Sequence, residues 1–197
     1  MRAILTATVM CVLALCAGCG NEPPAKPSET AQKTAEPAVP AEFQSAATAV
    51  LGGDAEVLVF GDLAKTGNQQ VLVINRIKKT PDNTVPGILL TRATILSQQD
   101  GKWTELLHVD EHLKNTNGFL AATPVAPVTG WRLQFEQHAE KGLQLYFTPL
   151  QQPAGGTLQV IGVRWNEKVK RYQSLDRTYQ HFLGESPSLE KINSYLR

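Results

Sequence analysis

The stretch Trp131-Arg132-Leu133-Gln134-Phe135-Glu136 alternates strictly between apolar and polar side chains. A second run, Leu143-Gln144-Leu145-Tyr146-Phe147, follows after a turn-forming segment at residues 138–142. A period of two places one face of a strand on a core and the other in solvent, as in antiparallel sheets. The two runs therefore predict a β-hairpin, the clearest in the chain.

Further apolar runs separated by turn residues extend this pattern along the chain. Residues 56–60 lead through Gly61-Asp62 and Thr66-Gly67-Asn68 into a second run at residues 71–74, and residues 87–95 and 157–165 are also β-rich. Short strands with turn signals between them are typical of all-β domains. We expect a mainly β fold whose antiparallel hairpins form a sandwich, a small barrel or a propeller-like sheet.

Helix is predicted only in short pieces. Residues 46–51 fit either a short helix or the first strand of the domain. Ser186-Pro187 fits an N-cap followed by proline at the first helical position, which predicts a short helix through Leu196. Residues 178–183 before Gly184 predict another turn or two of helix. Short helices are therefore expected near the C-terminus.

The beginning of the chain has the order of a secretory signal. Arg2 precedes an apolar run at residues 3–15, and Cys16-Ala17-Gly18-Cys19 then places two small residues before a cysteine. This ending resembles the lipobox of bacterial lipoproteins, although Cys16 stands where that family prefers leucine. The resemblance implies removal of residues 1–18 as a signal peptide and attachment of a diacylglycerol to the Cys19 thiol. The alternative is ordinary cleavage after Gly18, which leaves a free thiol.

Residues 19–41 predict a lipidated cysteine followed by a flexible tether. The segment is rich in proline and polar residues, and Val39 is its one large aliphatic residue. Such a composition buries too little apolar surface to offset chain entropy, and about 3 Å per residue allows a reach of up to ~70 Å. The prolines are Pro23, Pro24, Pro27, Pro37 and Pro40. Residues 42–197 are then expected to form a single mainly β domain.

Composition excludes several classes of function. The formal net charge is +1, so no broad field attracts the chain to nucleic acid, and no nucleic-acid partner is expected. Every cysteine (Cys11, Cys16 and Cys19) lies at or before the cleavage point. The mature domain can therefore use no disulfide within it, no cysteine-bound metal and no cysteine nucleophile.

His108-Val109-Asp110-Glu111-His112 has the pattern H-x-x-E-H and resembles the zinc motif of the inverzincin metallopeptidases. The resemblance implies that His108 and His112 bind zinc from one helix face, with Glu111 as the base. A distant third ligand would be Glu185 or Glu190. The alternative is a solvated surface segment, because the motif follows the strand-like residues 102–107.

Gly61-Asp62-Leu63-Ala64-Lys65-Thr66-Gly67 resembles the loop of the FG-GAP or VCBS repeats of integrin-like β-propellers, over residues 57–75. The resemblance implies a strand–loop–strand unit with a non-catalytic, adhesive role. Calcium binding in that family uses several oxygen side chains, but here only Asp62 keeps a carboxylate. The alternative is a tight loop in which Asp62 caps backbone donors.

Basic and aromatic side chains gather near the end of the domain. Trp165 and Tyr172 lie among Arg164, Lys168, Lys170, Arg171 and Arg177, with Glu167 and Asp176 interrupting the charge. The segment fits a solvated hairpin face, or else a contact with anionic headgroups or envelope polysaccharide.

Together these patterns predict a membrane-anchored lipoprotein of the cell envelope with a non-catalytic binding or scaffolding β domain. The alternative is a zinc-dependent hydrolase built on His108, Glu111 and His112. The expected partners are the lipid bilayer, through acylated Cys19, and an envelope protein or glycan. No cofactor is expected. In the Gram-negative lipoproteins that the N-terminus resembles, an aspartate after the lipidated cysteine favours retention in the inner membrane. Gly20 stands at that position here, so the resemblance implies the outer membrane, with the domain facing the periplasm or the exterior. The oligomeric state is left open.

Overall fold

The computed structural model describes residues 38–78, 85–151, 159–176 and 181–183. The chain divides into two compact units, Met1–Pro37 and Ala38–Arg197, and all described residues belong to the second. The predicted signal peptide, Cys19 and most of the predicted tether lie outside the described residues. Within the described residues, no helix combines the length and the apolar character needed to cross a bilayer.

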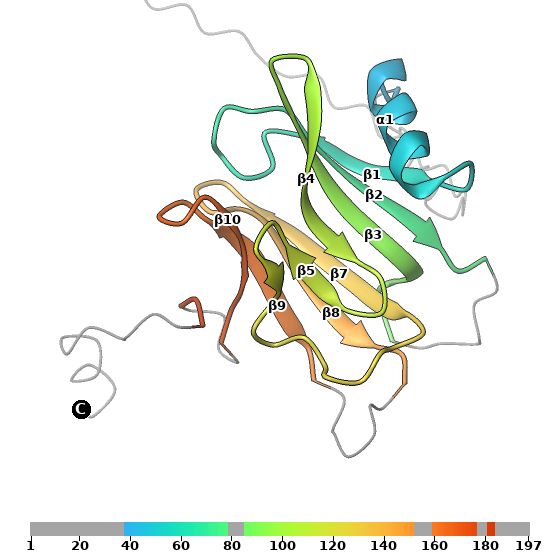
Figure 1. The fold of residues 1–197 in the computed structure, drawn as a ribbon, viewed down its shortest axis with the longest axis vertical. Helices are drawn as coiled ribbons and strands as arrows, with labels where there is room; N and C mark the ends of the chain where they lie inside the picture. Colours follow the sequence, from blue (N-terminus) through green and yellow to red (C-terminus); the bar gives the residue numbers. More distant parts are fainter. Residues whose placement is uncertain (1–37, 79–84, 152–158, 177–180, 184–197) are drawn as a thin grey trace, which may run out of the picture. The chain divides into compact units, whose positions relative to one another are not determined.

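The described chain is mainly β, as predicted, and every strand pairing is antiparallel (Figure 1). One helix, α1 (Ala41–Leu51), precedes the strands. The strands are β1 (Glu56–Gly61), β2 (Gln70–Arg76), β3 (Ile88–Gln99), β4 (Lys102–Val109), β5 (Leu113–Asn115), β6 (Gly118–Phe119), β7 (Trp131–His138), β8 (Gly142–Pro149), β9 (Ile161–Asn166) and β10 (Arg171–Ser174).

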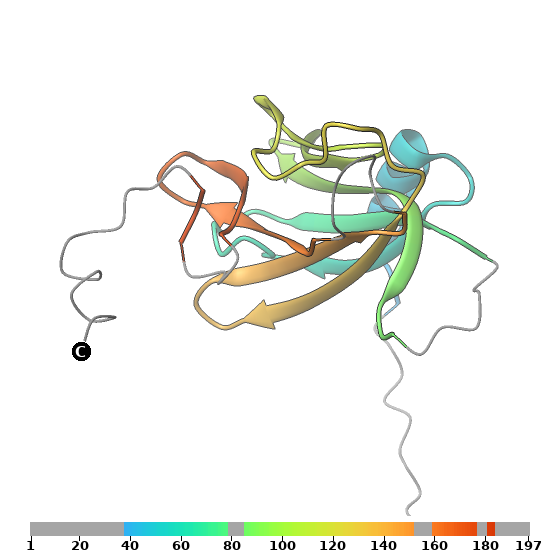
Figure 2. The same cartoon turned by 90° about the horizontal axis from the view of Figure 1, so that it is seen from below.

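The long strand β3 organises the sheet, because three other strands pair with it. One edge of β3 pairs with β2, while the other pairs first with β7 at residues 88–90 and then with β4 at residues 93–99. The sheet therefore forks into two wings, β7-β8-β9-β10 and β4-β5-β6. It curls into a half-barrel, the arrangement closest to the predicted small barrel (Figure 2).

The hairpin predicted from alternation is confirmed as β7 and β8, with Leu133 opposite Phe147. Leu133, Leu145 and Phe147 are buried, as the alternation requires. The alternation does not predict burial at the far end of the hairpin. Phe135 is 39% exposed there, whereas Gln144 is 4% exposed. The Gln144 amide donates to the Tyr146 hydroxyl at 2.8 Å, which gives this buried polar side chain a hydrogen-bond partner.

Two apolar clusters stabilise the fold, one on each face of β2. Leu72 and Ile74 point into the main core inside the curled sheet. Val71 and Val73 pack instead against Phe43 and its neighbours on α1. Because both faces are covered, residues 70–74 are buried without interruption. This explains the continuous apolar run in the sequence.

The helix predictions have a mixed outcome. Residues 46–51, left open between helix and strand, are helical, and the helix begins earlier, at Ala41. The predicted helix at residues 186–196 lies outside the described residues. The helix predicted to reach Leu183 is wrong at residues 181–183, because Phe182 forms a β-bridge with Leu175 instead. Leu183 N then donates to Ser174 O at 3.0 Å, a strand-like contact that holds this segment against β10.

Candidate functional site

The H-x-x-E-H motif lies at the end of β4 and in the turn that leads to β5. His108 belongs to β4 and pairs with Lys114 of β5, while His112 lies in the turn. The helical placement that the zinc motif requires is therefore wrong. Leu107 and Val109 are fully buried on either side of the half-buried His108, which is the period of a strand.

Carboxylates contact both ring nitrogens of His108. The Nδ1 atom lies 2.8 Å from Glu105 Oε1, and the Nε2 atom lies 3.1 Å from Asp110 Oδ2. Asp110 also accepts hydrogen bonds from Lys114 Nζ at 2.8 Å and from the His112 amide at 2.9 Å. This polar network ties β4 to β5 across their connecting turn.

His112 is held separately from His108. Its ring packs edge-to-face on Phe119 at 5.2 Å, and its Nε2 atom lies 3.4 Å from the Val125 carbonyl oxygen. Glu111 is exposed, while Glu185 and Glu190 lie outside the described residues. In the part of the chain that the structure describes, no three His, Cys, Asp or Glu side chains are arranged to hold a metal.

Asp110 has a perturbed pKa. Burial raises its pKa, but hydrogen bonds from Lys114, the His112 amide and His108 outweigh burial and hold it at about 2, below the usual 3.8. A carboxyl group whose pKa is lowered by folding stabilises the protein above its unfolded pKa. That contribution is lost as the pH falls through the folded value. The relevant window therefore runs from about pH 4 down to about pH 2.

We expect Asp110→Asn to remove this pH dependence. At pH 7 the variant should be less stable than the native protein by roughly 2 kcal/mol, and the difference should shrink towards pH 2. Urea unfolding at several pH values measures it, with Asp100→Asn in the exposed β3–β4 turn as the matched control. A stability difference that stays constant between pH 7 and pH 2 would contradict the assignment.

The loop between β1 and β2 is organised by Asp62. Its two carboxylate oxygens accept hydrogen bonds from the Thr66 amide at 2.8 Å and the Gly67 amide at 3.1 Å. This is the geometry of a tight loop in which an aspartate caps backbone donors. The strand–loop–strand shape is present as β1 and β2, and the resemblance to the FG-GAP or VCBS repeats stays a prediction.

The basic residues near the end of the domain do not share one solvated face. Arg164 is 9% exposed, and its guanidinium lies 4.9 Å from the centre of the Phe182 ring. Lys170 forms an ion pair with Glu167 across the β9–β10 turn. Arg171 and Lys168 line two different pockets. Arg177 lies outside the described residues.

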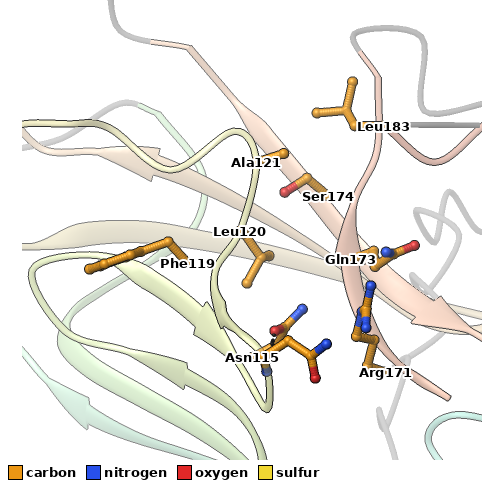
Figure 3. A pocket seen from close by; sticks show the side chains of 9 residues that line it. Asn115, Phe119, Leu120, Ala121, Arg171, Gln173, Ser174 and Leu183 are labelled. Carbon is orange, nitrogen blue, oxygen red and sulfur yellow. Dashed lines mark hydrogen bonds between the residues drawn. The ribbon is translucent and has the colours of Figure 1, made fainter. Parts of the chain in front are cut away.

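The first pocket, here called the polar pocket, has a volume of about 200 Å³ and lies beside β10 (Figure 3). Much of its polar lining is already used to hold its walls together. Asn115 Nδ2 donates to the Tyr172 carbonyl at 2.7 Å, and its Oδ1 accepts from the Asn117 amide at 2.8 Å. The lining residues are Asn115, Asn117, Phe119, Leu120, Ala121, Arg171, Gln173, Ser174 and Leu183.

The second pocket, here called the basic pocket, has a volume of about 380 Å³. Three connections meet around it: the β1–β2 loop, the β7–β8 turn and the β9–β10 hairpin. The Leu143 amide donates to the Leu63 carbonyl at 2.6 Å, and this hydrogen bond holds the β1–β2 loop against the start of β8, next to the β7–β8 turn. Its lining residues are Ala64, Lys65, Glu140, Lys141, Arg164, Trp165, Asn166, Glu167, Lys168 and Phe182.

Positive charge dominates the basic pocket. Within the described residues, Lys65, Lys141 and Lys168 have no ion-pair partner. The charge of Glu167 is already balanced by Lys170, and its carboxylate also accepts a hydrogen bond from Trp165 Nε1 at 2.8 Å. The three lysines therefore form an exposed cationic rim over a buried arginine.

The sequence predicts only part of this pocket. Arg164, Trp165 and Lys168 belong to the predicted basic segment, whereas no pattern marks Lys65 or Lys141 as a site residue. Their contribution depends on the approach of three connections that are far apart in sequence, and no local pattern signals that approach.

Comparisons of the chain with protein-family models, with curated proteins and with solved structures give no match. A fold shared by many functions would in any case not assign one. The features of this chain that bear on function are the side chains of the two pockets and the sequence of the N-terminal segment.

Proposed function

We propose that the protein is a lipid-anchored component of the bacterial cell envelope whose β domain binds a ligand or partner without catalysing a reaction. The observation that carries the anchor is Cys16-Ala17-Gly18-Cys19, which directly follows the apolar run at residues 3–15. Lipidation would also remove the thiol of the one cysteine that signal cleavage leaves in the mature chain.

The basic pocket supports the binding role. Loops held at the ends of rigid strands are common positions for binding sites, and this pocket has the size of small-ligand sites. Its ligand would be part of an envelope glycan or of an envelope protein. The residue after Cys19 is Gly20 rather than aspartate, which favours the outer membrane, with the domain facing the periplasm or the exterior.

We expect Cys19→Ala to abolish labelling of the protein by radioactive palmitate and to release it from the membrane fraction. Without the thiol, no thioether to diacylglycerol can form. Cys11→Ala removes a cysteine from the apolar run and serves as the control, which should stay labelled. Persistent labelling of the Cys19→Ala protein would refute the anchor.

The zinc-dependent hydrolase makes a different prediction about metal content. Stoichiometric zinc in the purified protein, lost on His112→Ala, would contradict a purely binding role. The separate environments of His108 and His112 favour the binding proposal over this alternative.

A further inference from the structure

We propose that the basic pocket binds a compact polyanion, a sugar-sized ring that carries at least two phosphate groups. This inference rests on the proposed binding function and names the ligand class of that site. It does not depend on the lipid anchor.

The arrangement of charge supports an anion with more than one negative group. The exposed Lys65, Lys141 and Lys168 come from three different connections around the pocket, and Arg164 forms part of its buried wall. The whole chain has a formal net charge of only +1. Four cations and two carboxylates line this one cavity, so positive charge is in local excess there rather than spread over the whole surface.

The acidic residues near the pocket offset only part of this charge. Glu167 forms an ion pair with Lys170, a lysine that does not line the pocket. Asp62 lies in the β1–β2 loop but does not line the pocket, and its two oxygens accept hydrogen bonds from amides of its own loop. Glu140 is the one acidic lining residue without an ion-pair partner among the described residues.

The buried wall explains why a ring-shaped ligand fits better than a free ion. Trp165 is half-buried, with its ring packed edge-to-face on Tyr172 at 5.4 Å, so it is held in place. Phe182 also lines the pocket, but the Arg164 guanidinium covers one face of its ring, so Trp165 is the aromatic side chain on which the ligand ring would pack. Aromatic walls suit the apolar face of a sugar ring, while lysines bind phosphate groups as point charges.

The full-length protein in a neutral detergent can be titrated calorimetrically with glucose 1,6-bisphosphate, and with glucose as the uncharged control. We expect saturable binding of the bisphosphate, no binding of glucose, and weaker binding as the salt concentration rises. The double variant Lys65→Gln/Lys168→Gln should bind the bisphosphate about tenfold more weakly.

The matched control is Arg92→Gln/Lys102→Gln, which removes the same charge from residues outside the pocket and should leave binding unchanged. Adding lipid A, a lipid whose headgroup is a bisphosphorylated disaccharide, to the micelles distinguishes the source of the phosphates. Competition by these micelles assigns a lipid headgroup, and its absence assigns a phosphorylated glycan.

Absence of bisphosphate binding by the folded native protein would overturn the inference, as would equal binding by Lys65→Gln/Lys168→Gln. Neither result would affect palmitate labelling at Cys19, which tests the anchor separately.

Discussion

Trp131→Ala should destabilise the domain by about 3–5 kcal/mol, the range for truncating a large buried aromatic side chain. Trp131 has no exposed surface, and its ring packs edge-to-face on Phe147, with the ring centres 6.1 Å apart. Its indole Nε1 donates to the Asp110 carbonyl at 2.6 Å. The residue therefore joins the main core to the β4–β5 turn, and the substitution removes both connections.

Urea unfolding of the full-length protein measures the loss, and two variants separate its causes. Trp131→Phe keeps most of the apolar contact but leaves the Asp110 carbonyl without its donor, so a loss of about 1–3 kcal/mol is expected. Trp165→Ala truncates the half-buried tryptophan of the basic pocket and should cost less than Trp131→Ala. Equal losses for Trp131→Ala and Trp165→Ala would contradict the central position assigned to Trp131.

Local patterns predicted the antiparallel β character because it is encoded residue by residue. The alternation of residues 131–136 and 143–147 identifies β7 and β8, and their register follows from the short turn between them. The fork at β3 has no such signal. Strand β3 pairs with β7 at residues 88–90 and with β4 at residues 93–99. Strand β4 follows β3 directly, but β7 begins more than thirty residues after β3 ends, so no local pattern signals the pairing of β3 with β7.

For the candidate sites, too, sequence patterns show the local spacing of residues but not the contacts between distant segments. The spacing of His108 and His112 brings two imidazoles together only on a helix. The alternating burial of Leu107 and Val109 places this segment on a strand instead. The basic pocket is predicted only in part, because Lys65 and Lys141 meet Arg164, Trp165 and Lys168 through contacts between distant parts of the chain.

The approach of the β1–β2 loop to the β7–β8 turn depends on Gly142. This residue is buried and has a φ of +73°, and an added Cβ would collide with the Leu63 carbonyl oxygen and lie 3.2 Å from Ala64 Cα. Both neighbours are backbone atoms, so no side-chain rotation relieves the collision. We expect Gly142→Ala to cost about 1–2 kcal/mol for the left-handed backbone conformation and about 1–3 kcal/mol more for the displaced loop.

Gly101→Ala isolates the first of these two costs. Gly101 has a nearly identical φ of +75° in the β3–β4 turn, but an added Cβ there meets nothing within 4 Å. Urea unfolding should therefore show a clearly larger loss for Gly142→Ala than for Gly101→Ala. Because Leu63 precedes the lining residues Ala64 and Lys65, the Gly142→Ala displacement should also weaken binding of glucose 1,6-bisphosphate, whereas Gly101→Ala should not. Equal stability losses for the two variants would mean that the β1–β2 loop can move away from residue 142 without a loss of stability. The loop would then not be a rigid wall of the basic pocket, which would contradict the role assigned to Gly142.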